Sequence, residues 1–93
     1  MTEHIDRAID EIEHKLWAVE NLHKRLAIAL QHRNLPPDDT EYEKAERFIR
    51  RYGGLLEVNK SERYYRGQIM AYRTSLRILR QAKILAEAVA EEL

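Results

Sequence analysis

The sequence predicts an all-α protein in which two long helices form an antiparallel hairpin and a short helix between them caps the connecting end. Apolar residues recur at spacings of three and four in two long stretches, at about residues 3–33 and 61–92, as they do along one side of an α-helix. A shorter stretch of the same kind lies between them, at about residues 40–52. We therefore expect residues 1–93 to form one three-helix, bundle-like domain, and we expect that domain to be dimeric.

The first helix is defined by a regular apolar seam that ends at two prolines. The seam is typical of a helix that packs lengthwise on another helix. Pro36 and Pro37 stop it, because the residue before a proline avoids the α region and proline has no N–H to donate. His23 occupies a seam position, where we expect a core histidine bonded to Tyr65 or Tyr72 of the third helix. The apolar members of the seam are Ile5, Ile9, Ile12, Leu16, Val19, Leu26 and Leu30.

The second helix is short and has recognisable ends. It begins at Asp39 or Thr40, and Thr40 with Glu43 has the spacing of a capping box. Gly53 and Gly54 are the expected stop at its C-terminus. The apolar segment 55–58 that follows is expected to be a loop that plugs the end of the bundle.

The third helix, capped by Ser61 or by Asn59 with Glu62, carries three different faces. Its core face contains Tyr65, Ile69, Tyr72, Leu76, Leu79, Ala82, Ala86, Ala90 and Leu93. A second face contains Arg63, Arg66, Met70, Arg73, Arg77, Arg80 and Ile84, again at spacings of three and four. Beside the core face, Ile78, Leu85 and Val89 make the apolar arc wider than one partner helix needs.

Helix lengths favour the hairpin over an up-down-up bundle. At 1.5 Å per residue the two long helices are each about 45 Å long, whereas the short helix is about 20 Å long and would return only halfway. The first and third helices should therefore pair with each other along their length. Since the short helix cannot reach Ile78, Leu85 and Val89, we expect a second subunit to cover them, most simply in a two-fold homodimer or in a higher homo-oligomer.

Composition narrows the class of protein further. The chain contains no cysteine, so neither a disulfide nor a thiolate metal site is available, and a cytoplasmic location is expected. Its apolar runs are too short to span a membrane, so no membrane partner is expected. No two of the four histidines lie three or four residues apart, which argues against a metal site or a bound cofactor. Neither a glycine-rich phosphate loop nor a nucleophile motif is present, and we expect no catalytic residue and no enzymatic activity.

The arginines of the third helix suggest the first function. Net charge is zero overall, but residues 44–83 carry a net charge of +8 while residues 1–43 carry −5. Arginine suits phosphate, because its planar fork donates two hydrogen bonds at once. We therefore predict a small non-enzymatic oligomeric accessory protein that binds a nucleic-acid backbone or another polyanion. The binding residues would be the arginine ladder, which consists of Arg63, Arg66, Arg73, Arg77 and Arg80.

A protein–protein interaction module is the alternative. The first helix carries its own polar line, in which Trp17 interrupts the acids Asp6, Asp10, Glu13 and Glu20, and these acids could neutralise the arginine ladder. The chain would then be an adaptor, an assembly subunit or an inhibitor. It would dock on a larger protein through Trp17, with Ile28 on nearly the same side, and through the apolar face of the third helix. A second possibility for Trp17 is that the second helix or another subunit covers it.

A third alternative comes from Arg25 and His32. These residues lie on one face of the first helix with six residues between them, and they resemble the Arg-x4–6-His motif of the HEPN ribonucleases. That family consists of helical proteins that dimerise to bring two such motifs together, so the resemblance implies that Arg25 and His32 would assist RNA cleavage. It covers eight residues, and the motif here ends the first helix, whereas in the family it usually lies late in a four-helix domain.

Overall fold

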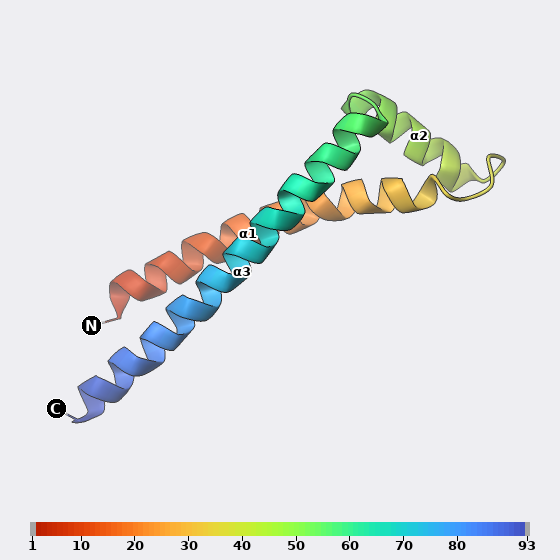
Figure 1. The fold of residues 1–93 in the computed structure, drawn as a ribbon. Coiled ribbons are helices and arrows are strands. Elements are labelled where there is room, and N and C mark those ends of the chain that lie inside the picture. Colours follow the sequence, from red (N-terminus) through yellow and green to blue (C-terminus); the bar gives the residue numbers. More distant parts are fainter. Residues whose placement is uncertain (1, 93) are drawn as a thin grey trace.

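The computed structural model describes residues 2–92, and these residues form three α-helices and no strand. The helices are α1 (Glu3–His32), α2 (Thr40–Tyr52) and α3 (Leu55–Glu92). The all-α, three-helix prediction is thus confirmed. α1 packs mainly against α3, and α2 packs against both. Figure 1 shows α2 at one end of the molecule and both chain ends at the other.

The start of α2 is capped by Asp39. Its backbone is extended, and its carboxylate accepts a hydrogen bond of 2.8 Å from the backbone N–H of Glu41. Thr40 is therefore the first helical residue and not the cap, so the expected capping box with Glu43 is replaced by this simpler arrangement.

The junction between α2 and α3 differs from the prediction. α3 begins at Leu55, so the expected start at Ser61 is wrong and the segment expected to be an apolar loop is helical. Gly53 and Gly54 have φ values of 125° and 106°, and their N–H groups return to the carbonyls of Arg50 and Ile49. The Gly54 carbonyl then accepts the N–H of Val58 at 3.1 Å. Two glycines with positive φ thus complete the turn, and α3 starts directly after them.

The hydrophobic core lies at the end where all three helices meet. Leu26 of α1 and Val58 of α3 are completely buried, and Ala29, Ala45 and Ile49 pack with them. Away from this end only α1 and α3 face each other, and Ile69 and Leu76 are the remaining buried residues in the described chain. The other apolar residues on the facing sides of α1 and α3 are half-buried, because a pair of helices cannot enclose side chains on all sides. Ala90, expected on the core face, is exposed, and Leu93 lies outside the described residues.

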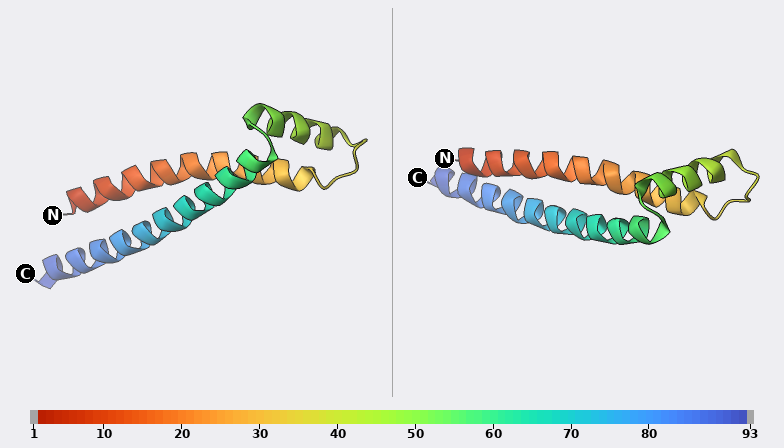
Figure 2. Two further views of the ribbon diagram at one scale, coloured as in Figure 1. Left: turned by 45° about the horizontal axis from the view of Figure 1, so that its top comes forward. Right: turned by 90° about the horizontal axis from the view of Figure 1, so that it is seen from above.

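The shape is elongated, as Figure 2 shows from two further directions. The extents are 67 × 20 × 15 Å and the radius of gyration is 19.3 Å, whereas a compact domain of this length has a radius of about 12 Å. The accessible surface is 7202 Å², and a compact protein of the same mass exposes about 5,700 Å². The single chain therefore exposes about 1,500 Å² more surface than a compact fold would. None of the described helices is both long and apolar enough to cross a membrane.

Candidate functional site

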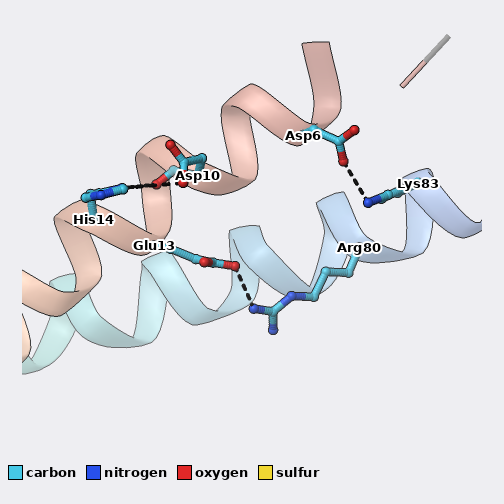
Figure 3. A network of polar contacts seen from close by, with 6 residues as sticks. All are labelled: Asp6, Asp10, Glu13, His14, Arg80 and Lys83. Atoms are coloured by element: carbon cyan, nitrogen blue, oxygen red, sulfur yellow. Dashed lines mark hydrogen bonds and ion pairs between the residues drawn. The ribbon is translucent and has the colours of Figure 1, made fainter. Parts of the chain in front are cut away.

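Ion pairs join the arginine-bearing flank of α3 to the acidic line of α1. Arg73 lies 3.7 Å from Glu20, and Arg80 lies 3.1 Å from Glu13. The next cation along α3, Lys83, lies 2.7 Å from Asp6, and Figure 3 shows this pair beside the Arg80 pair. The later a residue lies in α3, the earlier its partner lies in α1. Exposed pairs of this kind contribute little to the stability of the fold.

The pair nearest the chain ends also shifts two pKa values. The hydrogen bond from Lys83, followed by the one from Thr2, lowers the pKa of the Asp6 carboxyl. The same contact raises the pKa of Lys83, because the charged ammonium is the form that Asp6 favours.

Asp10, the remaining acid of the line, pairs within α1. The Nδ1 atom of His14 lies 2.8 Å from the Asp10 backbone carbonyl and 3.6 Å from its carboxylate, as Figure 3 also shows. The carbonyl contact and then the carboxylate charge raise the pKa of His14. Asp10 is thus accounted for without an arginine partner.

The arginine ladder divides into two columns. With 3.6 residues per turn, a step of three residues turns the side-chain direction by about −60° and a step of four by about +40°, so a line drawn at alternating spacings of three and four consists of two columns, each with members seven residues apart. Arg66, Arg73 and Arg80 form one column, and each has an acidic partner, which for Arg66 is Glu62 at 3.4 Å. The second column contains Arg63, Met70, Arg77 and Ile84. All four are exposed, and neither of its arginines forms an ion pair within residues 2–92.

Trp17 lies between two of the ion pairs. Its side chain is 71% exposed, and α2 does not cover it. It lines a shallow groove of about 420 Å³ between α1 and α3, together with Glu13, Leu16, Glu20, Arg73, Leu76 and Arg80. The groove therefore has an apolar centre and a charged rim, as the centre of a protein–protein interface does.

Ile28 lies in a different groove from Trp17. It is 39% exposed and lines a hollow of about 400 Å³ between α1 and α2, with Phe48 among its neighbours. Arg25 and His32 line the same hollow, and His32 lies 3.7 Å from Glu41. No group of three or more histidine or acidic residues in the described chain could hold a metal ion.

His23 has a different partner from the expected tyrosines. Its Nε2 atom lies 3.3 Å from a carboxylate oxygen of Glu62, and both side chains are largely buried. Since α3 is already helical before Ser61, Glu62 lies on a helix beside His23 and not in a cap. The prediction of Tyr65 or Tyr72 as the partner is therefore wrong.

An uncharged line runs along the outside of α3. Ile78, Leu85 and Val89 are 56%, 66% and 54% exposed, so the patch predicted from the sequence has no cover in the single chain. The first two belong to a longer series at alternating spacings of three and four, and every member is exposed and uncharged. We call this series the outer seam; it consists of Tyr64, Gly67, Ala71, Thr74, Ile78, Gln81, Leu85 and Ala88.

Sequence reasoning found only the large apolar members of the outer seam. Gly67, Thr74 and Gln81 are not apolar, so a search for hydrophobic spacing passes over them. The signal that could have found them is the absence of charge, because Lys60 and Glu92 are the nearest charged residues on this line.

Comparisons with protein-family models, with curated proteins and with solved structures found no match to this chain.

Proposed function

We propose that this chain is a non-enzymatic protein–protein interaction module, an antiparallel helical hairpin that self-associates and docks on a larger protein. The main support is a contrast between paired arginines and uncovered apolar side chains. The column of arginines that faces α1 is neutralised within the chain, while large apolar side chains such as Trp17, Ile78 and Leu85 stand exposed. Ile78 and Leu85 share the outer face of α3 while Trp17 lies in a separate groove, and exposed apolar patches of this kind are typical of surfaces that bind another protein.

Self-association through α3 follows from the energy of burial. Covering a Leu, Ile or Val side chain is worth about 1.5–3 kcal/mol, and the outer half of α3 exposes three of them on one side. A standard interface buries about 800 Å² on each partner, which is about half of the surface that this chain exposes beyond a compact fold. A homodimer therefore accounts for both the apolar patch and the elongated shape.

The larger partner would dock at the Trp17 groove. Tryptophan is among the residues most enriched at the energetic centre of interfaces, and here it is flanked by Leu16 and Leu76 and rimmed by two ion pairs. This groove lies on the paired arginine flank of α3, so it stays open when a second copy covers the outer seam.

Sedimentation at two salt concentrations tests the proposal. The purified chain is run at tens of micromolar, alone and with a labelled short single strand and duplex. We expect an oligomer at both salt concentrations and no co-sedimentation with either strand. Co-sedimentation that falls with salt at a slope near −4 to −5 would mean that all five arginines contact phosphates, and it would overturn the proposal.

Two matched arginine variants sharpen the test. Arg77→Glu changes an exposed residue that has no ion pair within residues 2–92, whereas Arg80→Glu removes the 3.1 Å ion pair with Glu13 and puts a second acid opposite it. We expect Arg80→Glu to lower the melting temperature by more than Arg77→Glu does. Equal melting temperatures would show that the ion pairs of this flank do not stabilise the fold.

Polyanion binding is the second candidate function. It is supported by Arg63 and Arg77, which are exposed and have no acidic partner within residues 2–92. Two duplex phosphate contacts would give a salt slope of about −2, shallower than the full ladder would give. The double variant Arg63→Glu/Arg77→Glu would then abolish binding to the strand, and unchanged binding would exclude this candidate.

A further inference from the structure

We propose that the outer seam of α3 packs against the outer seam of a second copy that runs in the opposite direction, with the two-fold axis between Thr74 and Ile78. This inference rests on the proposed self-association, and it adds the occupant of the surface, its direction and its register. Heptad spacing on an exposed helix face is the pattern by which two helices pack lengthwise, and here it continues from Tyr64 to Ala88.

Side-chain size is complementary in this register. Leu85 of one copy meets Gly67 of the other, Ala88 meets Tyr64, and Ile78 meets Thr74. Large side chains thus face small ones on both sides of the axis, as knobs face holes. In a parallel pair each residue would meet its own copy, so Leu85 would crowd Leu85 while Gly67 left a gap opposite Gly67.

The glycine at position 67 is best explained by the close packing of a second helix. It lies in the interior of α3, where glycine weakens a helix relative to alanine. A Cβ atom built at Gly67 meets nothing within 4 Å, and the residue has no positive φ. Nothing in the single chain therefore requires glycine here, whereas the close approach of Leu85 from a second copy does.

Charges agree with the antiparallel direction. The seam ends at Lys60 and Glu92, and in this register Lys60 of one copy meets Glu92 of the other. Along one edge Arg63 faces Glu91 of the second copy, and neither residue has an ion pair within the described chain.

The second arginine column flanks the same edge. Met70 and Ile84, which are 65% and 64% exposed, face each other across the interface, which explains two apolar residues among arginines. Arg77 meets its own copy near the axis. This is the one unfavourable contact, and it lies at the exposed edge, where water and salt screen it.

Engineered cysteines test the register directly, because the natural chain has none. The double variant Gly67→Cys/Leu85→Cys should form a disulfide-linked dimer on oxidation, while each single variant should stay unlinked. The two cysteines are about 27 Å apart on one helix, so they cannot pair within a chain. The matched control is Ala71→Cys/Leu85→Cys, which is offset by one turn and should link more slowly.

The other possible outcomes of the cysteine experiment distinguish a wrong register from a wrong interface. Rapid linking of Leu85→Cys alone would show a parallel pair, and faster linking of the control would show a register one turn away; both overturn the inference and leave self-association in place. A dimer in sedimentation that links in none of the variants would place the interface elsewhere. A monomer at tens of micromolar would refute the proposed self-association as well.

A bulky residue at Gly67 gives an independent test. Gly67→Leu has room in the single chain but collides with Leu85 of a second copy, so dimerisation should weaken about tenfold or more while helix content by circular dichroism is kept. Ala18→Leu, at an exposed position of α1, is the control and should not change dimerisation. Equal dimerisation of Gly67→Leu and the natural chain would overturn the inference.

Discussion

Replacing Leu85 by alanine should weaken self-association strongly and barely change the fold of the single chain. Leu85 is 66% exposed, so about two thirds of its side chain remains to be buried by a partner. Full burial of a leucine is worth about 1.5–3 kcal/mol, which leaves about 1–2 kcal/mol for each copy. A two-fold dimer loses this twice, about 2–4 kcal/mol in all, and the dissociation constant should rise about 30-fold to 900-fold.

Sedimentation equilibrium over a range of concentrations measures this constant. The matched control is Leu56→Ala, which removes the same side chain from a position of α3 that is 79% exposed and lies outside the outer seam. Its dissociation constant should equal that of the natural chain. The thermal stability of both variants as monomers should stay within about 0.5 kcal/mol of the parent. Equal weakening by the two variants, or none by Leu85→Ala, would refute the assignment of this face as the subunit interface.

Three further predictions concern the single chain. Leu26→Ala leaves a cavity at a completely buried position and should lower the free energy of unfolding, measured with urea, by about 2–5 kcal/mol. A decrease below about 1 kcal/mol would contradict the placement of the core. Gly53→Ala should lower the free energy of unfolding by about 1–2 kcal/mol, because φ is 125° at this position. Gly67→Ala, measured in dilute solution, should raise the free energy of unfolding by about 0.5–1 kcal/mol, because alanine favours the helix and its Cβ atom meets nothing within 4 Å. Changes of the same sign in the two variants would contradict this. By NMR titration the pKa of His14 should lie above 6.5, so its contribution to stability is complete below pH 6.5 and disappears as the pH rises through the raised pKa. Asp10→Asn should lower that pKa only in part, since the backbone carbonyl is the larger cause, and a complete return to 6.5 would assign the shift to the carboxylate.

Part of the candidate surface could be predicted from the sequence. The width of the apolar arc on the third helix indicated that Ile78, Leu85 and Val89 exceed what one partner helix covers, and the structure leaves all three exposed. Whether a second copy covers them stays a prediction. The sequence also places Trp17 in the acidic line of the first helix, but its groove depends on Arg73 and Arg80, which belong to a helix more than fifty residues later in the chain.

The start of α3 could not be read correctly from local signals. Asn59 and Ser61 are both good capping residues, so they favoured a start near position 61. In the structure the Asn59 side chain donates instead to the carbonyl of Leu55, four residues earlier, as an interior residue. Gly53 and Gly54 complete the turn by themselves, and the sequence shows that they can end a helix but not that the next one begins at once.

The sequence by itself determined the three helices and their apolar faces, because periodicity, prolines and glycines act over a few residues. The tertiary structure alone decided which charges meet: Arg73 and Arg80 face acids of α1, while Arg77, on the same predicted face, does not. It also decided that His23 meets Glu62 and that the space beside Gly67 is empty. These features depend on how α1 and α3 are rotated and aligned against each other, and no single helix carries that information.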